Sequence, residues 1–417
     1  MRFLHISDLH LGKVLHGVSL LESGDQPYWI DRFLELAGEH HPDAVLISGD
    51  VYDRGSPSAA AVEQLSHLVE GLAAQDISVL MTAGNHDSGQ RLVFARELLA
   101  RQKVHIAGKV ERELIHVVLM DEHGPLTVWL MPYIFPAAVA KALDDDTIRD
   151  YDTAARRLLA EQQIDPSVRN VLIAHQNVTA FGKEAERGGS ESAVGGVGQV
   201  DFSVFDAFDY VALGHIHASY HVGRETVRYA GSPMCYHFNE TRQAAKGPVL
   251  VELGGKGTPV HIETLHIPPL HPMRELRGTA DELRRTELAR QSRGEYLRLA
   301  ITDQLLTPEL SNFFQRLAEQ RDSVLMERVS EFRQFADNIA SPGAETVQEK
   351  TLEELFVEFY TARSGGEEPD PNDLELLQEA GELLRNHAPD PKQRAAVDPA
   401  LTEQLLNYLM VQEGGRL

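Results

Sequence analysis

The sequence lacks features that several classes of protein require. It holds a single cysteine, Cys235, in 417 residues, which excludes an internal disulfide framework and is compatible with a reducing cytosol. No apolar run approaches the roughly 18 residues that a membrane-spanning helix needs. The first residues do not resemble a signal peptide either, because polar side chains interrupt the apolar ones. We therefore expect a cytoplasmic protein without a membrane segment.

Basic residues are also scarce. The chain has 39 lysines and arginines against 63 aspartates and glutamates, a formal net charge of −24. A stand-alone nucleic-acid binder is usually basic, so this composition argues against one. A field of this sign repels phosphate unless metal ions or a partner protein supply positive charge locally. The chain also has no G-x-x-x-x-G-K-[ST] motif, so any ATP hydrolysis would belong to a partner.

The chain is too long for one ordinary hydrophobic core, and its first 270 residues alternate short apolar runs with helical patterns. We expect helices at 27–39, at 59–74 and from about residue 92. We expect strands at 2–6, 44–47, 77–82, 126–131, 171–174, 210–213, 227–230 and 249–253. This alternation predicts a layered α/β sandwich for residues 1–270.

A second, smaller domain is expected after the proline-rich stretch 267–272. Strands at 296–302 and 324–329 flank a helix at 307–321, with Thr307 as its N-cap and Pro308 in its first turn. The pattern predicts a small α+β capping domain over 272–340.

The last part of the chain, 345–417, is expected to form a helical tail. Leu352, Leu355, Phe356 and Phe359 fall on one face of a helix, and polar, proline-rich linkers follow. This apolar stripe could pack on the chain's own core. Alternatively, the tail could be a tethered helical pair that docks on a partner, since short tethered helices need another apolar surface.

Side chains that can bind metal ions follow five of the expected strands. They lie in Asp8-Leu9-His10, Gly49-Asp50-Val51-Tyr52-Asp53, Gly84-Asn85-His86-Asp87, His175 and Gly214-His215-Ile216-His217. In open α/β sheets, binding sites gather outside the carboxyl ends of the strands, so the five segments can converge in space. Three of the segments begin with a glycine, which suits a sharp turn and a close approach of backbone to the site.

The types of these side chains indicate the kind of metal. Carboxylate, amide and imidazole donors without a thiolate suit manganese, iron or zinc. The set is too large for one tetrahedral zinc ion but fits two ions that share a carboxylate. Two such ions can generate a hydroxide near neutral pH and hold both oxygens of an in-line phosphoryl displacement. Burial of so many ionisable groups without an ion would be costly.

In order and spacing, these segments resemble the calcineurin-like metallophosphoesterases. Residues 1–8, 213–217 and 229–233 further resemble the bacterial nuclease subunits of that family, which act with an SMC-like ATPase in DNA double-strand-break processing. The resemblance implies a metallophosphoesterase nuclease domain at 1–270, a DNA-orienting cap at 272–340 and an ATPase-binding region at 345–417.

The resemblance also implies a role for each site residue. Asp8, His10 and His217 would hold one metal ion, Asn85, His175 and His215 a second, and Asp50 would bridge them. His86 would stabilise the transition state or protonate the leaving oxygen, and Asp87 would orient His86 through a hydrogen bond. The alternatives for His86 are an eighth ligand or a bystander.

For cofactors and partners, the resemblance implies two divalent ions, manganese first and magnesium second. It implies DNA as substrate, with exonuclease action on double strands and endonuclease action on single strands or hairpins. It further implies an SMC-like ATPase bound through the C-terminal helices, a homodimer within a heterotetramer, and association with the nucleoid. Two other functions stay open. One is a small-molecule phosphodiesterase or phosphatase, which can use the same ligands, and the other is a non-catalytic scaffold.

Overall fold

The computed structural model describes residues 1–180, 198–242, 246–287 and 294–332. All of these described residues belong to one compact unit. The helical tail expected at 345–417 therefore lies outside the described residues. The domain boundaries stay predictions.

Two six-stranded sheets form the larger part of this unit. In the first sheet, β1 (Arg2–Ile6), β4 (Ala44–Ser48), β5 (Ser78–Thr82) and β6 (Val104–Ala107) run parallel, and β15 (Val249–Glu252) and β16 (His261–Thr264) complete one edge in antiparallel pairing. In the second, β14 (Arg224–Tyr229), β12 (Tyr210–Gly214), β9 (Arg169–His175) and β8 (Gly124–Met131) run parallel between the antiparallel edge strands β13 (Tyr220–Val222) and β7 (Ile115–Asp121).

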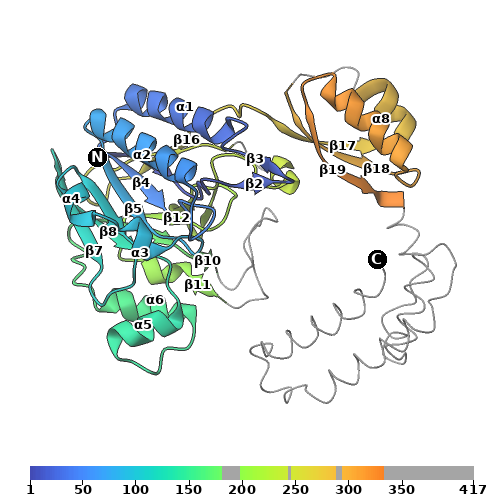
Figure 1. Cartoon of the computed structure of the whole chain (residues 1–417). Helices are drawn as coiled ribbons and strands as arrows, with labels where there is room; N and C mark the ends of the chain where they lie inside the picture. Colours follow the sequence, from blue (N-terminus) through green and yellow to red (C-terminus); the bar gives the residue numbers. More distant parts are fainter. Residues whose placement is uncertain (181–197, 243–245, 288–293, 333–417) are drawn as a thin grey trace, which may run out of the picture. The chain divides into compact units, whose positions relative to one another are not determined.

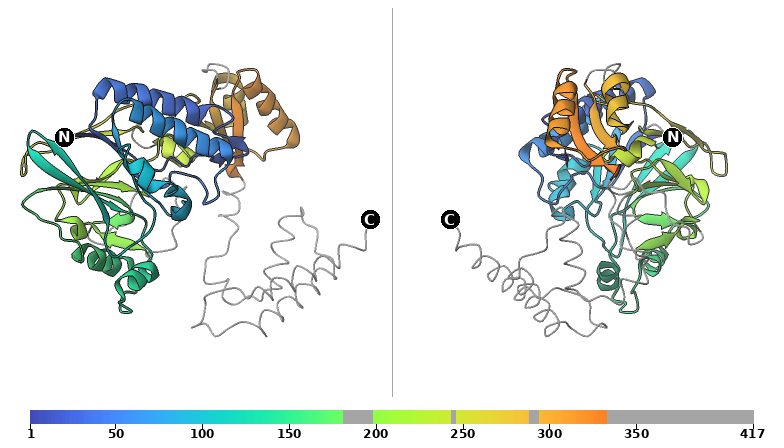
Figure 2. Two further views of the ribbon diagram at one scale, coloured as in Figure 1. Left: turned by 60° about the vertical axis from the view of Figure 1, so that its left-hand side comes forward. Right: turned by 90° about the vertical axis from the view of Figure 1, so that its right-hand side faces the viewer.

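Apolar side chains on both faces of each sheet produce a layered sandwich. Between the sheets, a buried cluster joins residues such as Phe3 and Leu46 of the first sheet to Val128 and Ile173 of the second. Helices α1 (Asp25–His40) and α2 (Ala59–Ala74) cover the outer face of the first sheet (Figure 1). Helices α5 (Pro136–Leu143) and α6 (Tyr151–Ala160) cover the second, on the opposite side from α1 and α2 (Figure 2). The predicted α/β sandwich is confirmed.

The smaller part of the unit is a parallel three-stranded sheet with helices. Its strands are β17 (Met273–Gly278), β18 (Tyr296–Ile301) and β19 (Val324–Ser330), in that order. Helix α8 (Pro308–Glu319) begins at Thr307, whose hydroxyl accepts a hydrogen bond from the Leu310 N–H, as the sequence predicted. Short helical turns, α7 (Ala280–Glu282) and a π-helix (Leu283–Glu287), follow the first strand. Its apolar core packs Phe314 of α8 against Leu299 and Leu276.

Shorter elements join these layers, and one expectation about them is wrong. The helix predicted from residue 92 is instead two short helices, α3 (Gly89–Leu92) and α4 (Arg96–Ala100), because Ala95 between them has a left-handed backbone with φ of 57°. The remaining elements are β2 (Val14–Leu15), β3 (Val18–Ser19), β10 (Asn177–Thr179), β11 (Gln199–Asp201) and the 3₁₀ helices Phe202–Phe205 and Phe238–Arg242. In the part of the chain that the structure describes, no helix is both long and apolar enough to span a membrane.

Candidate metal centre

The five polar segments meet because their strands run side by side. β1, β4 and β5 are consecutive neighbours in the first sheet, and β9 and β12 are neighbours in the second. Asp8 and His10 follow β1, Asp50 follows β4, and Asn85 follows β5. His175 ends β9, and His215 and His217 follow β12. The site therefore lies where carboxyl ends of strands from both sheets come together.

The Asp50 carboxylate lies between His10 and His175. Its Oδ2 is 3.3 Å from Nε2 of His175 and 3.6 Å from Nε2 of His10. Its Oδ1 accepts a hydrogen bond of 2.9 Å from the backbone N–H of His86. A carboxylate that faces imidazoles on two sides is suited to bridge two ions.

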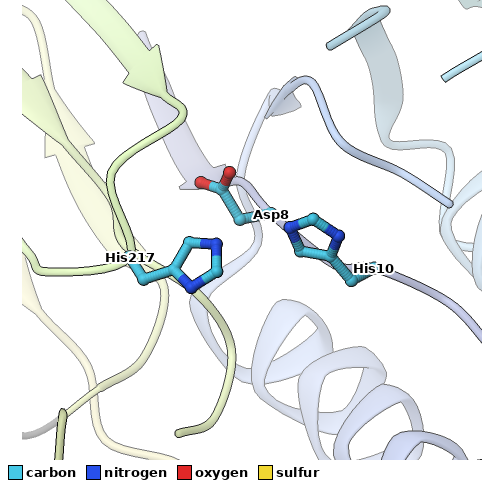
Figure 3. A group of neighbouring side chains, drawn as sticks. All are labelled: Asp8, His10 and His217. Carbon is cyan, nitrogen blue, oxygen red and sulfur yellow. The ribbon is translucent and has the colours of Figure 1, made fainter. Parts of the chain in front are cut away.

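Around Asp50, the remaining donors form two groups. Potential ligand atoms of Asp8, His10 and His217 all lie within 4.8 Å of one another, and Figure 3 shows the His10 and His217 rings pointing toward each other. In the other group, Oδ1 of Asn85 lies 3.1 Å from both Nε2 of His175 and Nδ1 of His215. The structure brings all seven predicted ligands together. Ligand atoms of Asp8 also lie within 4.8 Å of those of Asp50 and His175, so the division into two groups stays a prediction.

The surroundings of His10 suit a metal ligand. Both of its ring nitrogens are buried and face carboxylates at more than ordinary hydrogen-bond distance, Nε2 at 3.6 Å from Asp50 and Nδ1 at 3.5 Å from Asp53. Buried polar atoms nearly always have a close partner, so this loose spacing suits a cation between the ring and a carboxylate.

The atoms around the His175 ring also suit a cation. Its Nδ1–H donates to the Ser48 carbonyl at 2.7 Å, so Nε2 is the atom that faces the oxygens of Asp50 and Asn85. Burial alone would lower the pKa of His175. The negative charge and hydrogen bond of Asp50, together with the charge of Asp8, outweigh burial and raise the pKa of His175 to about 9. Nε2 is therefore the ring atom that would bind a cation together with Asp50 and Asn85.

The pKa values of Asp50, His215 and His10 are also shifted by burial and by neighbouring charges. Burial raises the pKa of Asp50, but His175 and His10 more than offset it and hold that pKa below its ordinary value. Desolvation and the positive charge of His175 lower the pKa of His215 to about 3, and desolvation lowers the pKa of His10. His215 is therefore neutral near pH 7, the form of imidazole that binds metals.

The backbone is strained at the ligands. Asp8, His10, Asp50 and His215 have positive φ angles of 53°, 43°, 47° and 103°. Non-glycine residues avoid this region unless the surrounding structure imposes it, and such strain is concentrated at functional sites. Glycine at position 84 lets this loop pass close to Asp50, because a Cβ there would collide with Oδ1 and the backbone nitrogen of Asp50.

His86 lies beside the group and is exposed. Its ring centroid is 4.8 Å from that of His10, and its Nδ1–H donates to the Asp53 carbonyl at 3.1 Å. Because a carbonyl only accepts, Nε2 is the ring atom left to exchange a proton. His86 also forms a possible ligand group with His10 and Asp50, so the geometry alone leaves the alternative of an eighth ligand.

Asp87 has a different role from the predicted one. Its carboxylate accepts hydrogen bonds from the backbone N–H groups of Gly84, Val51 and Tyr52, at 2.9 to 3.1 Å. The orienting contact of His86 is the Asp53 carbonyl instead. Asp87 thus joins the loop after β5 to the loop after β4. Burial and the nearby charge of Asp50 raise its pKa to about 6.

Two lysine–carboxylate pairs lie behind the histidines, and the pair formed by Glu240 and Lys246 was missed in the sequence. Glu240 lies 3.3 Å from Nδ1 of His217, and Nζ of Lys246 lies 2.9 Å from Glu240. Asp53 lies 3.5 Å from Nδ1 of His10, and Nζ of Lys13 lies 2.9 Å from Asp53. A carboxylate behind a ligating histidine fixes ring orientation and raises its basicity.

Between these two pairs, the buried Tyr236 contacts both histidines. Its ring centroid is 5.5 Å from those of His10 and His217, and its hydroxyl donates to the Leu9 carbonyl at 2.6 Å. No spacing in the sequence connects Tyr236 or Glu240 to the ligands. The only available signal was that the segment lies shortly after the last ligand.

Comparison with known proteins gives two family matches and a series of curated relatives. The sequence profile of the calcineurin-like phosphoesterases matches residues 1–219, a range that includes every predicted site residue. A second profile, described as the type 5 capsule protein repressor C-terminal domain, matches residues 269–364. Over 306 residues the chain is 30% identical to the SbcD subunit of the nuclease SbcCD from Staphylococcus saprophyticus subsp. saprophyticus, and the match covers 71% of this chain and 77% of the relative.

Proposed function

The chain belongs to the calcineurin-like phosphoesterase family, and from that premise we propose that it is a metal-dependent DNA nuclease, the counterpart of SbcD in an SbcCD complex. The reaction is hydrolysis of phosphodiester bonds during double-strand-break processing, repair and recombination. We expect exonuclease action on double strands and endonuclease action on single strands and hairpins. The observation that carries the proposal is the buried Asp50 carboxylate, which faces His10 on one side and His175 on the other.

We propose that two divalent ions bind here. Asp8, His10 and His217 would hold one, Asn85, His175 and His215 the other, and Asp50 both. Four imidazoles in the set favour manganese over magnesium, because magnesium prefers oxygen ligands. When bound, such ions activate water and neutralise the charge of a phosphodiester.

The chain's own residues then divide the remaining work. Asp50, His175 and Asn85 fix the position of the reacting groups, and the exposed His86 transfers a proton. The Asp53 carbonyl holds the Nδ1–H of His86, so Nε2 is the atom that would protonate the leaving oxygen. Asp87 supports this arrangement indirectly by fixing the loop that carries Asn85 and His86.

Turnover of DNA tests the proposal. We expect the full-length protein with manganese to degrade linear duplex DNA and to cut a single-stranded hairpin loop. Addition of EDTA should stop both reactions because the ligands would lose their cations. Product analysis on sequencing gels measures both reactions.

Cyclic nucleotides and a phosphopeptide serve as the competing substrates. Rapid turnover of either, with intact DNA, would instead favour a small-molecule phosphodiesterase or phosphatase. Absence of any phosphodiester cleavage by manganese-loaded protein would favour a non-catalytic scaffold.

We further propose that residues 345–417 bind an SMC-like ATPase, SbcC, and that the chain forms a homodimer within a heterotetramer. The support is the name of the relative, which is a subunit of SbcCD, and the profile that reaches residue 364. A cap at 272–340 would orient DNA. Such a complex would work in the cytoplasm, associated with the nucleoid.

Deletion of the tail tests this assignment of a partner. A chain ending at residue 344 should lose co-purification with the SbcC encoded in the same genome and keep basal manganese-dependent nuclease activity, because every predicted ligand precedes the cut. Size-exclusion chromatography of the co-expressed pair measures association. Undiminished association of the shortened chain would contradict the assignment.

A further inference from the structure

A groove adjoins the metal centre on the side of Asn85. Its volume is about 600 Å³, and Gly84 and Asn85 form one wall of it. Tyr133 and Phe135, on the loop between β8 and α5, form another. Asn85 is one of the predicted ligands, so a strand whose phosphate lies at the metal centre would place its next nucleotide in or beside this groove.

The loop that carries the two aromatic side chains is fixed to the site. The backbone N–H of Tyr133 donates to the Ala83 carbonyl at 2.8 Å, one residue before the Gly84 turn. The Tyr133 ring centroid lies 6.1 Å from the rings of both His175 and His215. The position of the loop therefore follows that of the ligands.

Phe135 continues this aromatic series outward. Its ring is 4.8 Å from that of Tyr133 in an edge-to-face arrangement, and its side chain is 53% exposed. It is the N-cap residue of α5 and precedes Pro136, which restricts its backbone. A fixed, half-exposed phenyl ring in a groove beside a nuclease centre is suited to stack on a flat partner.

The rim of the groove is cationic, although the protein is strongly acidic. Lys109 and Lys141 are both exposed, and no ion pair is found for either within the described ranges. Arg112 differs, because its guanidinium lies 2.7 Å from Glu161. Glu111 and Asp87 also line the groove, and the Asp87 carboxylate is taken up by backbone N–H groups. Unpaired lysines beside aromatic rings are the combination that binds single-stranded nucleic acid.

We propose that this groove is a nucleobase subsite, in which Phe135 stacks on an unpaired base next to the scissile phosphate while Lys109 and Lys141 contact the backbone. A base inside a duplex already stacks on its neighbours, so only an unpaired or splayed base can use the ring. The subsite therefore serves single-stranded ends and hairpin loops, whatever the base identity. The proposal rests on the proposed DNA nuclease function.

The test is binding of an oligonucleotide that contains 2-aminopurine, a base whose fluorescence falls on stacking. Calcium replaces manganese in this titration to prevent cleavage, with full-length protein. We expect quenching by the wild type, no quenching by Phe135→Ala, and a dissociation constant for single strands raised about 5- to 100-fold in that variant. Phe135→Tyr, which keeps the ring, should restore both.

A second substrate isolates the base itself. With manganese, Phe135→Ala should raise KM for a single-stranded oligonucleotide, whereas on one carrying abasic spacers the variant and wild type should be equal. Met120→Ala, which truncates an apolar side chain 68% exposed on β7, is the control and should match the wild type throughout. Equal KM and equal quenching in wild type and Phe135→Ala would overturn the subsite. Quenching that depends on Phe135 without any DNA cleavage would leave the subsite standing and overturn the nuclease function instead.

Discussion

Replacement of His86 with serine should lower kcat for DNA cleavage by about 100- to 10,000-fold while both metal ions stay bound. The reason is that His86 is exposed beside the ligands and has its Nδ1–H fixed by the Asp53 carbonyl. The variant removes the proton carrier and leaves Asp50, His10 and His175 in place. Single-turnover cleavage of a labelled duplex measures the rate, and elemental analysis measures the metal content.

The same pair of measurements separates the two roles of His86. Loss of one bound ion along with activity would make His86 an eighth ligand, a role compatible with its closeness to His10 and Asp50. An unchanged rate would remove it from the chemistry. His123→Ser, which alters an exposed histidine in the turn between β7 and β8, is the matched control and should keep full activity.

Replacement of Asp50 with asparagine should abolish cleavage and the thermal stabilisation by manganese. Its carboxylate faces both His10 and His175, so its loss weakens both predicted sites. For the wild type, manganese at 100 times its dissociation constant should add about 2.7 kcal/mol to the free energy of unfolding per site. Melting curves with and without manganese measure the difference.

Two further variants provide reference points for the loss of metal affinity. Glu240→Gln keeps every predicted ligand but replaces the carboxylate behind His217 with a neutral amide. It should therefore reduce metal affinity by about 10- to 100-fold without abolishing binding. Asp146→Asn changes an exposed carboxylate away from the ligands and should bind metal like the wild type. A normal manganese response in Asp50→Asn would contradict the bridging role.

The sequence predicted best what depends on short-range pattern. Helix α2 has the predicted bounds, and Thr307 caps α8, because apolar periodicity and capping chemistry act within a few residues. The ligand segments could be located because each follows a buried strand. Their convergence then followed from the arrangement of parallel strands rather than from any one motif.

What the sequence could not give depends on contacts between distant segments. The partner of His86 is a backbone carbonyl, which no side-chain pattern reveals, so Asp87 was assigned the wrong contact. Glu240 reaches His217 only through the turn that also places Tyr236. Ala95 breaks a helical pattern although alanine favours helices, because tertiary structure imposes its backbone angle.

The metal centre draws its donors from both sheets, and this has a mechanical consequence. The layers already touch at this seam through polar contacts, since the Ser48 hydroxyl donates to the Ala212 carbonyl at 2.9 Å and His175 donates to Ser48 at 2.7 Å. Cations held by Asp50 on one layer and His175 on the other would crosslink the two halves of the sandwich. Binding of the metal ions would therefore restrict movement of one sheet relative to the other. The same ions that enable catalysis would also stabilise the packing of the two sheets.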